Sequence, residues 1–384
     1  TISVSAFLLN RSSDLGPCNF AIQTKQLKQT KFRHMKFVIS SSVLSSRLMT
    51  IGRVIVQKNT IPILDCFCFD IQGTTLTITA SDNDTTLTAK AELNECDSDV
   101  RFAVNAKTLQ DAIKEIPDQP LECYLNTESY ELTVEYQNGQ YKLMGQSAEE
   151  YPTPAISDET RLDFDLECQK LVPSITRCMI AAANDALRPQ LNTICFDIHS
   201  QEVSLVSSNG NQLALTKLAM PELNAEGSYL LGTRPASLLK GMLAKAEGNV
   251  HFSIGQRTAI VHTEEYSLTS RLVEGRFPNY RSVIPQDNPN IVTVNRLALV
   301  SALRRVLVFA NAQAVLVKFR LGPNTMNISS QDIDFGKSAE ENMLCDYMGT
   351  PMRIAFKGSV LLDLINNIEG DDITLKLSDP SRAG

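Results

Sequence analysis

The residues CFDI at positions 68–71, followed by LTITASDN at positions 76–83, form a motif that recurs twice further along the chain. The other two copies are CFDI at 195–198 with VSLVSSNG at 203–210, and KFRL at 318–321 with MNISSQD at 326–332. Their phenylalanines, Phe69, Phe196 and Phe319, lie 127 and 123 residues apart. One motif repeated at nearly constant spacing predicts three tandem copies of one structural module.

The sequence around each copy alternates between strand and helix patterns. Apolar residues two apart, as in Leu76 and Ile78, indicate strands, whereas the three- and four-residue spacing of Leu44, Leu48 and Ile51 predicts a helix. In order, each repeat reads strand, helix, three strands, and then the same series again. We therefore predict an α+β fold in which each of three domains is a pair of βαβββ halves, with sheets on one side and helices on the other.

The repeats also predict the domain boundaries. The first domain is expected at residues 35–157, the second at 158–286 and the third at 287–384. Residues 1–34 lack a strand or helix period, and we interpret them as a non-native or disordered extension. The third repeat ends at Gly384, before counterparts of the last two strands of the second repeat. We interpret this domain as C-terminally truncated, with an exposed sheet edge.

Bulk composition excludes several classes of protein. The 384-residue chain has no apolar run long enough to span a bilayer and no signal sequence, so we expect it in the cytoplasm. Its nine cysteines include no CxxC pair, and its four histidines are not at metal-ligand spacing. Phosphate-binding and hydrolase motifs are missing. We predict that the protein is not an enzyme and needs no cofactor or metal.

Positive charge is concentrated in the predicted helices. The six helices together carry +8, which leaves −15 on the remainder of a chain whose net charge is −7. Arg53, Arg177 and Arg305 point away from the apolar stripes of their helices. A solvated surface explains any single basic helix, but the recurrence favours one layer of the protein suited to phosphate. The residues predicted to face DNA are Arg47, Arg53, Lys58, Lys107, Lys114, Lys170, Arg177, Arg188, Arg234, Lys240, Lys245, Arg296, Arg304 and Arg305.

Three segments carry a resemblance to a known family. The opening MKF at 35–37, TIPIL at 60–64 and LVEGRFPNYR at 272–281 closely resemble the bacterial DNA polymerase III β subunit, the replicative sliding clamp. The resemblance runs from Met35 to the end of the chain. It implies a head-to-tail homodimeric ring of six such domains, with helices lining the hole and sheets outside. Such a ring would encircle duplex DNA without reading its sequence and tether the polymerase and other clamp-binding proteins.

Two alternative functions remain open at this point. Another DNA-ring polymerase accessory factor would share the basic helices, but the archaeal and eukaryotic clamps have two domains per chain, and the third repeat argues against them. An enzyme on a repeated α/β scaffold would need a cleft in which titratable groups converge.

The resemblance further implies a pocket that takes short peptides from polymerases, the clamp loader and repair proteins. The matching positions are Leu191, Ser208, Gly210, Asn211, Gln212, Leu213, Pro278, Ser282 and Val283. Gln212 and Ser282 are uncharged where family members often carry basic residues. The family's C-terminal tail, which forms part of this pocket, is also missing here. We therefore expect weakened peptide binding.

A dimer contact is expected at the end of the helix predicted for residues 295–311. Val308 lies nearly opposite the apolar stripe of this helix and Leu307 lies to one side, so both are candidates for burial by a partner. In the family this region meets an aromatic residue of the neighbouring copy, at the position of Tyr151. A head-to-tail contact of this kind closes into a ring only if its rotation allows closure.

Overall fold

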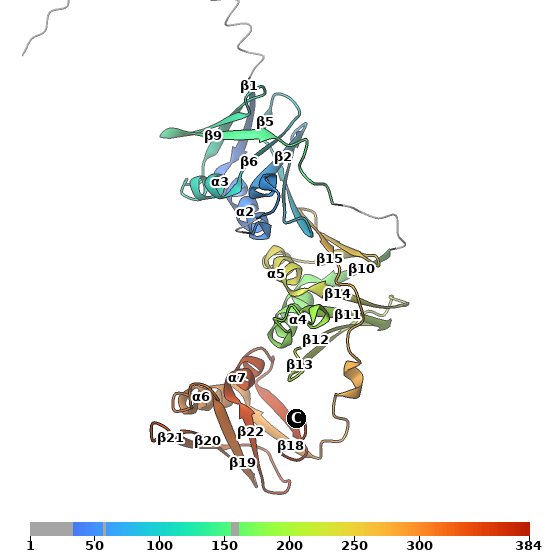
Figure 1. Ribbon diagram of the computed structural model, residues 1–384, viewed down its shortest axis with the longest axis vertical. Coiled ribbons are helices and arrows are strands. Elements are labelled where there is room, and N and C mark those ends of the chain that lie inside the picture. The colour runs from blue at the N-terminus through green and yellow to red at the C-terminus, as the bar shows by residue number, and fades with distance from the viewer. Residues whose placement is uncertain (1–33, 57–58, 155–160) are drawn as a thin grey trace, which may run out of the picture. The chain divides into compact units, whose positions relative to one another are not determined.

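A computed structural model describes residues 34–56, 59–154 and 161–384 of the chain. The described residues form two compact units (Figure 1). The first unit extends to residue 153 and contains the first repeat; the second contains the other two repeats, and residues 84–86 are grouped with it. Of the expected N-terminal extension, residues 1–33 lie outside the described ranges. His34, which we assigned to that extension, instead begins the first strand.

The first repeat follows the predicted order of strand, helix and three strands. Its elements are β1 (His34–Ser40), α2 (Ser41–Ile51), β2 (Cys66–Gln72), β3 (Thr75–Ser81), β4 (Thr85–Glu92), β5 (Glu95–Cys96), β6 (Val100–Asn105), α3 (Ala106–Ile113), β7 (Pro120–Asn126), β8 (Glu131–Tyr136) and β9 (Gly139–Ser147). Helix α2 contains Leu44, Leu48 and Ile51, whose spacing predicted a helix; Gly52 caps its end, and a short 3-10 turn, Gly52–Val54, follows.

The two halves of the first repeat exchange their first strands. Strand β1 pairs with β7 of the second half, with Phe37 opposite Cys123. Strand β6 pairs with β2 of the first half, where Phe69 lies opposite Phe102 and their rings stack at a centroid distance of 5.1 Å. The two sheets therefore run β5-β1-β7-β8-β9 and β4-β3-β2-β6. Because each half completes the other's sheet, neither can bury its core alone.

Strand β9 pairs first with β8 and then with β6, so it joins these two sheets. Gly145 occupies the point of transition. A Cβ atom at this position would lie 2.8 Å from the carbonyl oxygen of Tyr130 and 2.9 Å from that of Ala103. Both neighbours are backbone atoms held by strand pairing and cannot move aside easily, so the close approach requires glycine.

The second repeat has the same organisation. Its elements are β10 (Leu162–Glu167), α4 (Cys168–Ala181), β11 (Thr193–Ser200), β12 (Glu202–Ser208), β13 (Leu213–Ala219), β14 (Ala225–Gly232), α5 (Thr233–Met242), β15 (Asn249–Ile254), β16 (Thr258–His262) and β17 (Tyr266–Arg271). First strands are again exchanged, giving the series β13-β12-β11-β14 and β10-β15-β16-β17.

The third repeat has fewer strands in its second half. Its elements are β18 (Asn290–Asn295), α6 (Arg296–Leu307), β19 (Leu316–Gly322), β20 (Thr325–Asp332), β21 (Lys337–Leu344), β22 (Met352–Lys357), α7 (Gly358–Asn366) and β23 (Asp372–Leu377). One sheet runs β21-β20-β19-β22, and the other contains β18 and β23. Residues 378–384 form no strand, so this second sheet has two strands where its counterpart in the second repeat has four.

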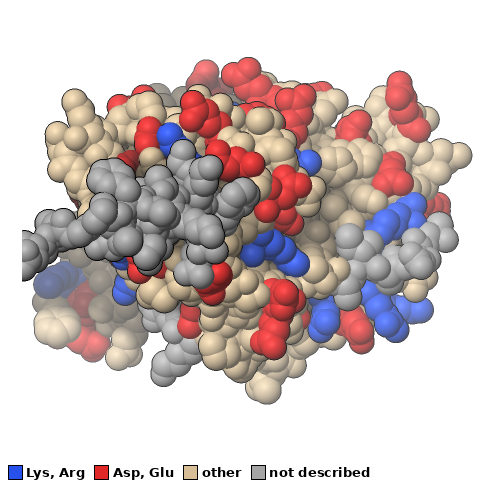
Figure 2. Space-filling model, turned by 90° about the horizontal axis from the view of Figure 1, so that it is seen from above, with Lys and Arg blue, Asp and Glu red and all other residues tan. Residues whose placement is uncertain are grey.

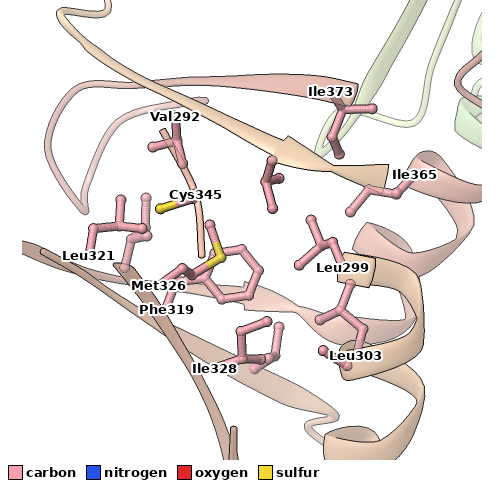
Figure 3. Close-up of a cluster of buried hydrophobic side chains, with 14 of the residues drawn as sticks. Val292, Leu299, Leu303, Phe319, Leu321, Met326, Ile328, Cys345, Ile365 and Ile373 are labelled. Atoms are coloured by element: carbon pink, nitrogen blue, oxygen red, sulfur yellow. The ribbon is translucent and has the colours of Figure 1, made fainter. Parts of the chain in front are cut away.

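The core of the third repeat lies between its helices and its sheets (Figure 3). Leu299 and Leu303 of α6 point toward Phe319, Met326 and Ile328 of the sheet, and all five are fully buried. The motif phenylalanine is thus a core residue here, as it is in the other two repeats. Burying a side chain of this size contributes about 2–3 kcal/mol.

The helices of each repeat form a pair. Helix α2 contacts α3, α4 contacts α5, and α6 contacts α7. Within each repeat the pair lies on one side of the sheets (Figure 1). The sheets and helices of a repeat therefore present separate surfaces, as the sequence predicted.

Candidate functional site

The described helices carry exposed basic side chains in every repeat. Arg53 and Lys107 are exposed in the first repeat, Lys245 is exposed just beyond α5 in the second, and Arg304 is exposed on α6 in the third. Arg234 is also exposed and Lys240 is half-buried, both on α5. Lys58 lies outside the described residues. On the face of the molecule seen in Figure 2, acidic side chains are widely spread.

Several of the predicted DNA-facing residues form ion pairs with nearby carboxylates. Lys114 pairs with Asp111 at 2.9 Å, Lys170 with Glu167 at 2.8 Å and Arg188 with Asp185 at 2.8 Å. The hydrogen bond from Lys114 raises the pKa of that lysine and lowers the pKa of Asp111. Exposed pairs of this kind contribute little to stability, but they reduce the charge offered to a phosphate.

The remaining four predicted residues are bonded within the protein. Arg305 forms a bidentate pair with Glu341, with its Nε 2.9 Å from a carboxylate oxygen. Arg177 donates from Nε to the carbonyl oxygen of Asn367 and pairs with Glu369. The Nε of Arg47 donates to the Lys90 carbonyl oxygen and that of Arg296 to the Gly370 carbonyl oxygen. The charge split read from the sequence therefore overstates the positive charge available on these helices.

The residues predicted to bind partner peptides surround one pocket of about 530 Å³ in the second unit. Leu191, Ser208, Gly210, Asn211, Gln212, Leu213, Pro278 and Val283 all line it. Ser282 does not, because its hydroxyl points back to donate to the carbonyl oxygen of Asn279. The other lining residues are Leu215, Phe277, Asn279, Tyr280, Ile284, Pro285, Ala383 and Gly384. Phe277, Asn279 and Tyr280 were within the quoted motif and could have been added to the predicted pocket from it, whereas Ile284 and Pro285 lie beyond it.

One wall of the pocket is a turn built by its own side chains. The Asn209 side-chain oxygen accepts from the backbone N–H groups of Asn211 and Gln212 at 2.9 and 3.1 Å. The Ser208 hydroxyl donates to the Gln212 carbonyl oxygen at 2.8 Å. Gly210 has φ +91°, a conformation that glycine adopts without strain. The turn is therefore preorganised, which lowers the entropy lost on binding a ligand.

Gln212, one of the lining residues, has a buried side-chain oxygen without a hydrogen-bond partner among the described residues. Its side-chain nitrogen donates to the carbonyl oxygen of Ile180 at 2.9 Å, which fixes the amide. Its Oε1 is buried and accepts no hydrogen bond from any described residue. A buried acceptor without a donor is unfavourable.

The opposite wall is held by a contact with the repeated motif. Tyr280 donates from its hydroxyl to Oδ2 of Asp197 at 2.6 Å, and Arg281 approaches the same oxygen at 2.7 Å. The guanidinium of Arg281 also lies over the Tyr280 ring, 5.0 Å from its centroid. Burial, together with the hydrogen bond to Asp197, raises the pKa of Tyr280 to about 12. The segment that carries Phe277 and Pro278 is thereby fastened to β11.

The candidate dimer residues have different environments. Tyr151 was wrongly expected to be available to a partner: it is 3% exposed, because its ring packs within the first unit against Leu64 and Ala148. Its hydroxyl donates to the carbonyl oxygen of Cys66 at 3.2 Å. Leu307 is half-buried against Gly358, whereas Val308 is 74% exposed.

In the described ranges, no three or more histidine, cysteine or acidic side chains gather so that they could hold a metal ion. Among the described residues, no helix is both long and apolar enough to cross a membrane.

Each repeat consists of two halves that exchange their first strands, with a pair of helices on one side of the sheets. Tandem repeats of this kind are the architecture of a clamp-type DNA polymerase accessory protein. Models of the DNA polymerase III beta subunit match the chain in order: the N-terminal domain at residues 35–155, the central domain at 165–279 and the C-terminal domain at 281–383. The chain belongs to the DNA polymerase III beta subunit family. It is a processivity clamp and not an enzyme.

Curated relatives and solved structures agree with this family. The chain is 28% identical to the beta sliding clamp of Pseudomonas putida and 26% identical to that of Haemophilus influenzae, covering 90% of this chain and 94% and 93% of the relatives. The sliding clamp of Pseudomonas aeruginosa, solved bound to griselimycin, superposes with a TM-score of 0.86 at 24% identity, covering 91% of this chain and 94% of the other. The beta subunit of Thermotoga maritima superposes with a TM-score of 0.83 at 25% identity and the same coverage.

Proposed function

We propose that two copies of the chain close head to tail into a ring around duplex DNA and tether the replicative polymerase to its template. The observation that carries this proposal is the presence of exposed cations on, or just after, the helices of all three repeats. Arg53, Lys107, Lys245 and Arg304 are matched by no acidic residue at hydrogen-bonding distance among the described ion pairs. Cations of this kind attract phosphates without reading bases, which suits a protein that slides.

We propose that the ring closes through one end of the third repeat. Val308 and Phe309 at the end of α6 are 74% and 40% exposed. The turn after β20 carries Ile333 and Phe335, which are 80% and 73% exposed. Asn311 links the two segments by donating to Asp334 at 3.4 Å, so the four apolar side chains share one end of the repeat. An exposed apolar group of this size favours burial against a protein partner, here a second copy of the chain.

The pocket around Gln212 is the proposed docking site for short peptides of clamp-binding proteins. Leu191, Leu213 and Val283 line it and supply apolar contact for a peptide. The partner class follows from family membership: DNA polymerases, the clamp loader and repair proteins. Because a replicative clamp acts on chromosomal DNA, we also propose the bacterial cytoplasm as its location.

The assembly can be tested by the mass of the particle in solution. Light scattering on the full chain should give twice the mass of one chain. Val308→Asp should shift the particle to a monomer, because burying an unpaired carboxylate is costly. Leu187→Asp provides the matched control, since Leu187 is also an exposed apolar residue, at 92%, but lies in the second repeat. Dimerisation unaffected by Val308→Asp would contradict the assigned interface.

A further inference from the structure

The repeated motif places different charges on the outward face of each repeat. The motif residues on the strand face away from the phenylalanine are Cys68 and Asp70 in the first repeat and Cys195 and Asp197 in the second, where both cysteines are buried. In the third repeat the corresponding residues are Lys318 and Arg320 on β19. A position that is acidic twice and basic once points to a surface that has a separate role in the third repeat.

The residues that lie opposite these positions on the neighbouring strand also differ in charge between the repeats. Asp70 lies directly opposite Arg101 on β6, so opposite charges face each other. Arg320 instead lies directly opposite Arg353 on β22. Like charges at directly opposite positions of an antiparallel pair destabilise a sheet. A sheet that retains such a pair is a candidate for binding a ligand that neutralises it.

These cations line a pocket of about 480 Å³ on the sheet of the third repeat. The side chains of Lys318, Arg320 and Arg353 are accompanied by those of Asn327, Ser329 and Glu340. The pocket therefore contains three cations and one carboxylate. Ala355 and Pro380 add apolar surface to its walls.

The single carboxylate in this pocket is already engaged. Glu340 approaches Arg320 at 3.3 Å, and it also accepts a hydrogen bond from the Asn327 amide at 2.7 Å. Asn327 is 8% exposed and in turn donates to Asn342 at 2.8 Å, so the amide holds Glu340 in place. No ion pair is recorded for Lys318 or Arg353 among the described residues. Two positive charges consequently remain without a counter-ion from the protein.

We propose that this cationic pocket binds an acidic peptide segment of a partner protein. Arginine forks match carboxylates bidentately, and the amide and hydroxyl groups of Asn327 and Ser329 suit a peptide backbone. Lys318 and Arg320 are two residues apart on one strand, about 6.6 Å, which equals the spacing of alternate side chains in an extended peptide. Two carboxylates at alternate positions would therefore meet two cations.

The lining of the pocket argues against single-stranded nucleic acid. Proteins that bind single strands stack the bases on exposed aromatic side chains. The described lining has one aromatic residue, Phe319, and its side chain is fully buried on the core side, with its ring edge-on to Phe356 at 5.5 Å. Charge attraction alone would hold the phosphates, with nothing to engage the bases.

The test uses the full chain and a fluorescent, end-blocked peptide with aspartate at alternating positions. Fluorescence anisotropy should show saturable binding that weakens as salt is raised. The same peptide with asparagine in place of aspartate should not bind. Arg353→Glu should weaken binding by about tenfold or more, because it removes a charged hydrogen-bond donor and adds repulsion. Arg257→Ser is the matched control, since Arg257 is exposed on the turn before β16, outside this pocket, and should bind like the wild type.

Two readouts separate a binding role from a structural one. Arg353→Glu puts an acid opposite Arg320, so its thermal midpoint should be at least that of the wild type while peptide binding falls. Arg353→Ser gives a second variant with the same expected loss of binding. Equal peptide affinity in the wild type and both Arg353 variants would overturn the proposal. Tighter binding of an oligothymidylate than of the aspartate peptide, abolished by Arg353→Glu, would also overturn it and assign the pocket to single-stranded DNA.

Discussion

The outward faces of β11 and β19 begin from the same motif position and use it in opposite ways. On β11, Asp197 accepts a hydrogen bond from Tyr280 and forms an ion pair with Arg281, and so anchors the segment that lines the 530 Å³ pocket. On β19, the matching residue is Arg320, which pairs with Glu340 and lies opposite Arg353, for which the described residues supply no ion pair. The fold needs only the phenylalanine between the outward residues. Each repeat is therefore free to use its outward positions for a different contact.

The largest effect is expected from removing the anchor on β11. Asp197→Ala leaves the buried Tyr280 hydroxyl without its acceptor, and hydrogen bonds to charged groups are worth about 1.5–3 kcal/mol. The free energy of unfolding of the second unit should fall by a similar amount in urea titrations. Affinity for a clamp-binding peptide should fall as well, because residues 277–285 lose their attachment. A change in stability of less than about 0.5 kcal/mol, which is typical of neutral surface substitutions, would contradict this role.

A smaller effect is expected when only the tyrosine hydroxyl is removed. Tyr280→Phe retains the ring under Arg281 and should cost about 1 kcal/mol, the usual net value of one hydrogen bond. The pKa of Tyr280 is raised to about 12, so its contribution is complete below the ordinary tyrosine pKa near 10 and is lost as pH rises toward 12. The free energy of unfolding of the wild type should exceed that of Tyr280→Phe at pH 8, and this difference should shrink at pH 11. The phenylalanine variant is the control, because it has no hydroxyl to ionise.

A substitution on the basic face of β19 should raise the stability of the protein, whereas the two substitutions above lower it. Arg320→Asp restores the residue type of the other two repeats and places an acid opposite Arg353. Replacing a like-charge pair by an opposite-charge pair should raise the free energy of unfolding by about 0.5 kcal/mol, because the exposed Arg320–Glu340 ion pair that is lost contributes little. Chemical denaturation of wild type and variant at low salt measures the difference. Destabilisation by this change would show that Arg320 has a structural role that the strand register does not reveal.

The smallest effect is expected at the matching position of the first repeat. Asp70 has no anchored segment to hold, and its recorded side-chain contact is a 3.3 Å hydrogen bond from Gln72. Asp70→Ala should change stability by less than about 0.5 kcal/mol, as exposed substitutions usually do. Urea titration of the first unit measures this change. A larger loss of stability would show that Asp70, like Asp197, anchors part of the fold, and would contradict the comparison.

Part of this structure could be predicted from the sequence, because local patterns determine it. Phe69, Phe196 and Phe319 recur at a fixed position and are at most 1% exposed, as a repeated core residue should be. The exchange of β1 and β6 between halves was not predicted, since alternation tells which side of a strand is buried but not which strand lies beside it. Gly145 indicates the junction between the two sheets of the first repeat only when β6 and β8 are already known to lie on either side of it.

The candidate site was predictable to a similar extent. The turn at 208–213 and the segment at 277–285 were suggested by the family resemblance, and the structure brings them to one pocket. The pairing of Arg305 with Glu341 on β21 could not be predicted, because the partner is 36 residues away and lies on a strand that meets α6 only in the fold. The expectation for Tyr151 was wrong for the same reason: its burial depends on residues of β2 and the preceding turn.

The central claim is that the protein holds DNA by encircling it, and retention on circular DNA tests this most directly. The clamp would be loaded on nicked circular DNA and separated by gel filtration at a salt concentration that removes electrostatic binding, before and after the circle is cut once. The account predicts a dimer that stays with the circle and is lost from the linear molecule, because a ring slides off a free end. Equal retention on circular and linear DNA would contradict topological binding and leave only attraction between basic residues and phosphate.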